Sequence, residues 1–275
     1  MKNEIYHNIL IYNSQLVEKD SIDEINLSDG VIVYEVIRVI DGIPLFLEDH
    51  MSRLNESANL AGFEININNV EINSSIRQLS IENQTLNGNI KLMFQFKKNH
   101  KLLFLCYFIK HNYPDDSEYQ HGVKTILFTA ERSNPLAKIN DFEFRQITEE
   151  IISNKKVYEV LLVNRNGLIT EGSKSNVFFI KDNIIYTAPE NIILQGITRK
   201  YVIETAYYSQ MEIVEKSVNK KDIKQFDSVF LTGTSPKILP VSSIGNINYD
   251  VNHPLLRKLM NEFEEEIDNY FYRIF

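Results

Sequence analysis

Residues 157–172, VYEVLLVNRNGLITEG, are the stretch from which the fold can be worked out. An apolar run stops there at Asn166-Gly167, a residue pair that favours a tight turn, and then resumes. The pattern predicts a strand, a turn and a returning strand that ends at Glu171-Gly172. Two further apolar runs, NVFFI (176–180) and IIYTA (184–188), predict a second hairpin across KDN.

Helices and strands alternate beyond this stretch. We expect a helix from Thr198 to about Ser209, and then two strands in DSVFLTGTSPKILPV, which Gly-Thr-Ser-Pro interrupts. A final helix begins near Pro254. Apolar residues recur along it at helical spacing and predict its buried stripe: Leu255, Leu259, Phe263 and Ile267.

The first half of the chain has the same mixed character. VIVYEVIRVI (31–40) predicts a strand, and LEDHMSRLNESANLAG (47–62) has the apolar spacing of a helix. IKLMFQF and LLFLCYFI predict a hairpin around KKNHK (97–101). Interspersed strands, helices and hairpins favour an α+β fold over a doubly wound parallel sheet.

A polar stretch divides the two halves. KHNYPDDSEYQHG (110–122) has a proline in its middle, as interdomain linkers often do. We therefore expect a smaller N-terminal domain over 1–113, a linker over 114–121, and a larger C-terminal domain over 122–275. Histidine and aspartate crowd this stretch, but the spacing of His111, Asp115, Asp116 and His121 fits no standard zinc pattern, so no metal site is expected.

Composition excludes several classes of partner. The chain has 275 residues, a net charge of −8 and no basic block, which argues against nucleic-acid binding. No run reaches the roughly 18 apolar residues of a membrane span. The N-terminus lacks the apolar stretch of a signal peptide, and the single cysteine, Cys106, cannot form an internal disulfide. These features predict a cytoplasmic, reducing location.

Three segments could bind an anion. The chain contains no P-loop, no G-x-G-x-x-G dinucleotide motif and no G-x-S-x-G nucleophile elbow. LQGITRK (194–200) opens a helix with Gly196, Ile197 and Thr198, and exposed N–H groups at such a start can hold a phosphate. The turn from Gly233 to Ser235 offers a second set of amides. Arg53 offers a guanidinium, which can bind phosphate in a bidentate manner.

Four separated segments, taken in order, resemble the fold-type IV pyridoxal-phosphate enzymes. They are DGVIVYEVIRVIDGIPLFLEDHMSRLNESANLAG, YEVLLVNRNGLITEGSKSNVFFI, LQGITRKYVIE and DSVFLTGTSPKILPV, and together they span about residues 28–245. The family includes branched-chain aminotransferases, D-amino-acid aminotransferases and aminodeoxychorismate lyase. The resemblance implies a two-domain α+β fold with mixed sheets, a barrel-like core and flanking helices, and it also implies a homodimer.

The resemblance assigns roles to individual residues. Lys138, which is 21 residues before Glu159, matches the lysine that carries pyridoxal 5′-phosphate as a Schiff base. The rivals are the Lys155-Lys156 pair, at an expected helix end among polar residues, and Lys174, within the Glu-Gly-x-x-Ser-Asn signature of the family. Glu171 would face the pyridine nitrogen of the cofactor. The other implied cofactor-binding residues are Arg53, Asn176, Gly196, Ile197, Thr198, Gly233 and Thr234, and Tyr34 and Ser235 are the implied substrate-binding residues.

The implied reaction is transamination between an amino acid and a 2-oxo acid. Lys138 would move the proton between the substrate Cα and the cofactor, which supplies the electron sink. Two alternatives stay open. The first is 4-amino-4-deoxychorismate lyase activity, although Glu35 and Val36 stand where that lyase has a threonine pair. The second is a cofactor-binding homologue without turnover.

Substrate choice is not settled by the resemblance. Asp141 and Phe142 replace the residues that follow the lysine in many members, which leaves the partner of the cofactor's ring hydroxyl open. The hairpin tip KKNHK has no arginine, unlike the tip of D-amino-acid aminotransferases. The Tyr-Ile-Arg-Pro segment of branched-chain enzymes is absent. Both L- and D-amino acids therefore remain candidates.

Overall fold

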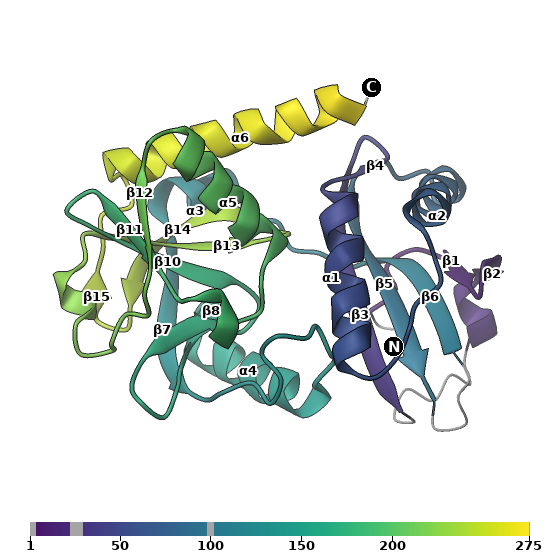
Figure 1. The fold of residues 1–275 in the computed structure, drawn as a ribbon, viewed down its shortest axis with the longest axis horizontal. Coiled ribbons are helices and arrows are strands. Elements are labelled where there is room, and N and C mark those ends of the chain that lie inside the picture. Colours follow the sequence, from purple (N-terminus) through teal and green to yellow (C-terminus); the bar gives the residue numbers. More distant parts are fainter. Residues whose placement is uncertain (1–3, 23–29, 98–101, 275) are drawn as a thin grey trace. The chain divides into compact units, whose positions relative to one another are not determined.

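The computed structural model describes residues 4–22, 30–97 and 102–274 of the chain, which forms two compact units. The first unit contains residues up to Asn112 together with Ala137–Asn140. The second contains Tyr113–Leu136 and Asp141 onwards. Figure 1 shows both units, each with its own sheet and helices. Most of the predicted hairpin tip KKNHK lies outside the described residues.

The first unit is built on a six-stranded antiparallel sheet in the order β2-β1-β6-β5-β3-β4. Its strands are β1 (Ile9–Tyr12), β2 (Gln15–Glu18), β3 (Val31–Ile40), β4 (Ile43–Pro44), β5 (Gly88–Phe96) and β6 (Leu102–Ile109). A short helix, η1 (Lys19–Ile22), follows β2. All nine residues of β5 are buried, and both of its edges are paired, with β6 and with β3.

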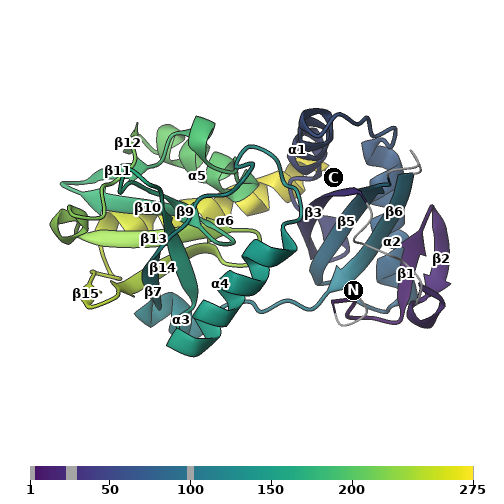
Figure 2. The same cartoon turned by 90° about the horizontal axis from the view of Figure 1, so that it is seen from below.

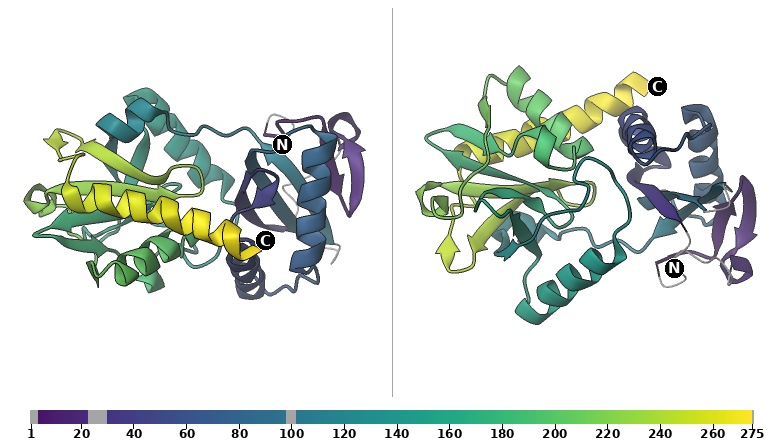
Figure 3. Two further views of the ribbon diagram at one scale, coloured as in Figure 1. Left: turned by 90° about the horizontal axis from the view of Figure 1, so that it is seen from above. Right: turned by 60° about the horizontal axis from the view of Figure 1, so that its bottom comes forward.

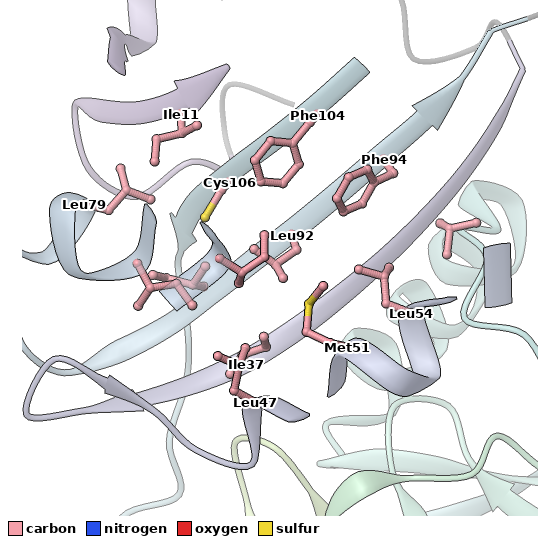
Figure 4. Packing of buried hydrophobic residues seen from close by; sticks show 14 of the residues in the cluster. Ile11, Ile37, Leu47, Met51, Leu54, Leu79, Leu92, Phe94, Phe104 and Cys106 are labelled. Atoms are coloured by element: carbon pink, nitrogen blue, oxygen red, sulfur yellow. The ribbon is translucent and has the colours of Figure 1, made fainter. Parts of the chain in front are cut away.

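Two helices, α1 (Leu47–Leu60) and α2 (Asn69–Glu82), pack on the sheet of the first unit. Figure 4 shows their contact: Met51 and Leu54 of α1 face Ile37 and Leu92 of the sheet. The apolar spacing of α1 produces this packing. The strand over 31–40, the helix over 47–62 and the two strands that flank KKNHK, all predicted from the sequence, are present.

The second unit contains a nine-stranded mixed sheet in the order β12-β11-β10-β13-β14-β7-β8-β9, with β15 paired to β14. The strands are β7 (Val123–Thr129), β8 (Glu159–Val163), β9 (Ile169–Gly172), β10 (Asn176–Lys181), β11 (Ile184–Thr187), β12 (Glu212–Glu215), β13 (Ser228–Gly233), β14 (Lys237–Ile244) and β15 (Ile247–Asn248). The inner faces of these strands form one apolar cluster, which confirms the predicted barrel-like core.

Helices flank this sheet on two sides. Figures 2 and 3 show α5 (Ile197–Tyr208) and α6 (Pro254–Ile274) on one side of it and α4 (Phe142–Lys155) on the other. Two short helices, η2 (Glu190–Ile192) and η3 (Ile223–Gln225), lie in its loops. The buried stripe of α6 begins at Leu256 rather than at the predicted Leu255, which is half-buried.

The predicted linker 114–121 is mostly helical. Helix α3 (Asp116–His121) begins after Asp115, whose side chain accepts a hydrogen bond from the Glu118 N–H at 2.8 Å. The Glu118 side chain returns a bond to the Asp115 N–H, which completes a capping box. This reciprocal cap explains why a polar, proline-containing stretch forms a helix of the second unit.

Candidate active site

The backbone of Lys138 is fixed in the first unit by β3 and α1. The Tyr34 N–H donates to the Lys138 carbonyl at 3.2 Å, and the Asn140 N–H donates to the Ile32 carbonyl at 2.9 Å. The Lys138 N–H in turn donates to Ser57 Oγ of α1 at 3.0 Å. Residues 138–140 therefore pair with the first half of β3, on the same edge of the strand that β4 pairs at its other end. They lie about a hundred residues further along the chain.

The Lys138 amine lies against the ring of Tyr34. Its Nζ atom is 5.0 Å from the ring centroid, within cation–π range. A second amine, Lys91 Nζ, lies 4.9 Å from the centroid of the same ring and also pairs with Glu4 at 2.8 Å. Tyr34 is only 5% exposed, so the residue predicted to bind substrate packs in the core and also contacts the predicted catalytic lysine.

Arg53, a predicted phosphate ligand, forms a buried ion pair on the opposite face of the sheet. Its Nε and Nη2 atoms both donate to Glu35 at 2.7 Å, one to each carboxylate oxygen. His50 Nδ1 lies 2.8 Å from Glu35 Oε2. Glu35 follows Tyr34 on β3, so the pleat directs the two side chains to opposite faces.

The electrostatics of this pair fix its charge state. Burial alone would raise the pKa of Glu35, but Arg53 and His50 outweigh it and hold that pKa below the ordinary value. Burial lowers the pKa of His50, and the positive charges of Arg53 and Lys138 act in the same direction. His50 is therefore neutral near pH 7, and the charge of Arg53 is balanced by Glu35.

Glu171 is buried at the end of β9 in the second unit. Its Oε1 atom accepts a hydrogen bond from Arg132 Nε at 3.0 Å, and Arg132 Nη2 donates to the Ser173 carbonyl at 2.7 Å. Arg132 is not among the residues predicted from the sequence. Its position in the irregular segment before Lys138 gives no periodic signal that could have done so.

A second buried carboxylate, Glu159, shapes the loop after Glu171. It accepts hydrogen bonds from the backbone N–H of Lys174, from Ser173 Oγ at 3.1 Å and from Ser175 Oγ at 2.8 Å. Burial raises the pKa of Glu159 despite these three donors, which oppose it. Residues 173–175, between β9 and β10, thus form a loop around the Glu159 carboxylate.

Asn176, at the start of β10, secures the segment that leads into α5. Its Nδ2 atom donates to the Leu194 carbonyl at 2.9 Å. Its Oδ1 atom lies so close to Gly196 that a Cβ added there would be 2.1 Å away. The helix then begins at Ile197, and its N-cap residue is Gly196, which has no side chain to cap the first turn. Asn176 was expected beside the cofactor, and the structure places it against the helix start.

The first turn of α5 fits a phosphate group. Ile197 and Thr198 are 7% and 8% exposed, and the side chain of Arg199 turns away to the Ala188 carbonyl and to Glu215. The N–H groups of the first turn point out of the helix, and the helix dipole favours a negative charge there. A helix start with a glycine and without a side-chain cap is suited to an external anion.

The turn from Gly233 to Ser235 lies at the same end of the sheet. Asn176 pairs with Thr232 in the register of β10 and β13, and Gly233 is the next residue. A Cβ at Gly233 would lie 3.8 Å from the Lys174 carbonyl. The unit therefore gathers the predicted residues Glu171, Asn176, Gly196–Thr198 and Gly233–Ser235 around the ends of β9, β10 and β13.

Other candidate chemistries find no support within the described ranges. No group of three or more His, Cys, Asp or Glu side chains there could hold a metal ion. No helix in the described part of the chain is long and apolar enough to cross a membrane. Cys106 is buried in the core of the first unit, and burial raises the pKa of its thiol.

Comparison with known proteins identifies the family. The model of the class IV amino-transferases matches residues 32–244. The D-alanine aminotransferase of Bacillus licheniformis is 28% identical over 94% of this chain and 96% of its own. The branched-chain aminotransferase of Thermoproteus uzoniensis shares the fold, with a TM-score of 0.84 at 20% identity over 95% of each chain.

A further solved structure bears on the alternative reaction. A Legionella pneumophila protein provisionally named 4-amino-4-deoxychorismate lyase aligns with a TM-score of 0.79 and 26% identity, over 90% of this chain and 97% of its own. These likenesses confirm the predicted fold-type IV architecture and an enzyme that depends on pyridoxal 5′-phosphate. The chain belongs to the class IV aminotransferases.

Proposed function

We propose that Lys138 is the residue through which this aminotransferase holds its cofactor and moves the substrate proton. The observation that carries this proposal is the placement of Lys138. Its backbone is fixed by β3 and Ser57, and its amine lies 5.0 Å from the Tyr34 ring centroid. Lys138 is half-buried, and its backbone is held in place. Its side-chain amine could therefore form and release a covalent bond to the cofactor without a movement of the main chain.

The remaining residues divide the work. When bound, pyridoxal 5′-phosphate supplies the aldehyde carbon and the electron-accepting ring. Lys138 Nζ removes the proton from the Cα of the amino acid and delivers it to the cofactor carbon. The N–H groups of Ile197 and Thr198, together with Gly233 and Thr234, bind the phosphate of the cofactor. Ser235 binds the substrate.

Glu171 and Arg53 would hold two different groups of the bound cofactor. The Glu171 carboxylate would keep a proton at the ring nitrogen. Arg53 is a proposed phosphate contact, and Glu35 fixes the plane of its guanidinium through Nε and Nη2. Asn176 acts on the cofactor indirectly: its hydrogen bond to the Leu194 carbonyl holds the start of α5 in place.

The proposed amino donor is a D-amino acid such as D-alanine. The name of the Bacillus licheniformis relative, which spans nearly the whole chain, supports this choice. Branched-chain L-amino acids are the competing class, because the Thermoproteus uzoniensis enzyme shares the fold. We further propose a cytoplasmic homodimer. The buried, unpaired thiol of Cys106 is consistent with a reducing compartment.

The lyase is the second candidate, supported by the likeness to the Legionella pneumophila protein. The resemblance distinguishes the lyase from the aminotransferases by a threonine pair, which the lyase has at the positions of Glu35 and Val36. Here Glu35 is fully buried and bound to Arg53 and His50, so it does not supply a hydroxyl to a substrate. This arrangement favours transamination.

The purified protein tests the assignment directly. We expect it to show the visible absorption of a lysine-bound pyridoxal, and to lose this absorption in Lys138→Ala. Single D- and L-amino acids should convert the band to that of the amine form, with D-alanine among the fastest donors. Pyruvate released from aminodeoxychorismate would support the lyase instead. An unaltered band with every amino acid would indicate a homologue without turnover.

A further inference from the structure

Arg132 makes three contacts within the second unit that fix its guanidinium. Nε donates to Glu171 Oε1 at 3.0 Å, and Nη2 donates to the Ser173 carbonyl at 2.7 Å. The Cζ atom lies 5.4 Å from the ring centroid of Phe144 on α4. A carboxylate, a carbonyl and an aromatic face therefore define both the position and the plane of this side chain.

The ion pair with Glu171 is largely shielded from water. Glu171 is 3% exposed, and the side chain of Arg132 is 22% exposed. A carboxylate at this depth needs a partner to stay ionised, because burial disfavours its charged form. Arg132 supplies that partner through its Nε atom.

Ser173, which Arg132 contacts through its carbonyl, is also held in place. Ser173, whose carbonyl binds Arg132, donates its own hydroxyl to Glu159 at 3.1 Å. Its N–H donates to the Val160 carbonyl of β8 at 3.0 Å. Arg132 is therefore tied to a loop that the sheet and a second carboxylate hold in place, so its direction towards Glu171 is set by the fold.

We propose that Arg132 is a positioning residue that keeps Glu171 ionised and aimed, so that Glu171 holds the proton on the ring nitrogen of the cofactor. This inference rests on the proposed role of Glu171. A proton shared between a ring nitrogen and a carboxylate resides on the group with the higher proton affinity. A guanidinium bound to the carboxylate lowers the proton affinity of the carboxylate, so the proton stays on the nitrogen.

Substitution should separate the charge of Arg132 from its geometry. Arg132→Gln removes the charge and keeps a donor, whereas Arg132→Lys keeps the charge but cannot make both hydrogen bonds and the ring contact. A matched control is Arg165→Gln, which removes the neighbouring exposed ion pair between Arg165 and Glu131. Arg165 has a side-chain exposure of 83% and is not part of the candidate site.

The readout is the protonation of the cofactor itself. The holoenzyme would be loaded with pyridoxal 5′-phosphate carrying ¹⁵N in the ring, and the nitrogen chemical shift would be followed against pH. We expect the nitrogen chemical shift near neutral pH to move towards the value of the unprotonated ring in Arg132→Gln, because the proton moves to the Glu171 carboxylate. Arg132→Lys should give an intermediate chemical shift, and Arg165→Gln should match the wild type.

Kinetics provide the second readout. Because Arg132 acts through Glu171 and not on substrate, kcat should fall by at least about tenfold in Arg132→Gln, while KM changes little. An unchanged nitrogen chemical shift in both Arg132 variants would overturn the proposal. If Arg132→Gln does not fold, the nitrogen chemical shift of Arg132→Lys decides alone, and a wild-type value would refute the proposal.

The variant Glu171→Gln tests the proposed role of Glu171 separately from the proposed role of Arg132. If Glu171→Gln removes the ring proton and the Arg132 variants do not, Glu171 has its proposed role and only the inference about Arg132 fails. If Glu171→Gln leaves the ring nitrogen protonated, the assignment of Glu171 itself is wrong.

Discussion

Gly196→Ala is the substitution whose effect the structure determines most closely. A Cβ on Gly196 would lie 2.1 Å from Asn176 Oδ1 and 3.3 Å from Asn176 Cγ. The backbone of Gly196 has a φ of −66°, which alanine adopts without strain. Any loss of stability therefore arises from the side-chain overlap and from the change of residue at the helix start.

The size of the effect follows from what must move. Asn176 is 4% exposed and is held by its bond to the Leu194 carbonyl at 2.9 Å. Displacing it costs about 1 kcal/mol for that hydrogen bond. Overpacking of a buried site adds about 1–3 kcal/mol. We therefore expect the free energy of unfolding to fall by about 2–4 kcal/mol, the sum of these two contributions.

A double-mutant cycle tests the reasoning in urea unfolding of the cofactor-free protein. Asn176→Ala provides room for the new methyl group, so Gly196→Ala should cost less in that background, with a coupling energy of about 1–3 kcal/mol. Cofactor affinity should fall in Gly196→Ala because the first turn of α5 shifts. Equal costs of Gly196→Ala in both backgrounds would refute the proposed contact.

Two further predictions concern the first unit. Glu35→Gln should lower the free energy of unfolding by about 3–5 kcal/mol, since it leaves the buried charge of Arg53 uncompensated. The pKa of Glu35 is depressed in the folded state, so its stabilisation is present above pH 4.5 and is lost as the pH falls further. Urea unfolding at several pH values should therefore show a flatter acid limb in the variant, and an unchanged limb would contradict this. Ser57→Ala should cost about 1–3 kcal/mol, since the Lys138 N–H loses its acceptor, and Ser57→Thr should restore part of this. A Ser57→Ala protein of wild-type stability would show that this bond contributes nothing.

Most of the elements could be predicted from the sequence because their signals are local. The Asn166-Gly167 turn, the apolar run of β3 and the helical spacing of α1 each depend on residues close together in the chain. Helix α3 was not predicted, although the capping box between Asp115 and Glu118 that begins it is also a local feature.

The contacts of the candidate site were less predictable because they join distant residues. Lys138 could be chosen by its spacing, but nothing in the sequence places its backbone on the edge of β3. Glu35 was noted only as the replacement of a threonine, and its pairing with Arg53 depends on the packing of α1 on the sheet. Arg132 lies in an irregular segment without a periodic sequence pattern. Its hydrogen bond to Glu171 is therefore visible only in the structure.

The identity of the cofactor-bearing lysine is the central claim, and chemical trapping tests it most directly. Two amines, Lys138 and Lys91, lie 5.0 and 4.9 Å from the ring centroid of Tyr34, so proximity to this ring does not distinguish them. Lys91 differs in that its amine is paired with Glu4 at 2.8 Å. Borohydride reduction of the holoenzyme, followed by peptide mass spectrometry, should place the phosphopyridoxyl group on Lys138. Its recovery on Lys91, or on any other lysine, would contradict the account.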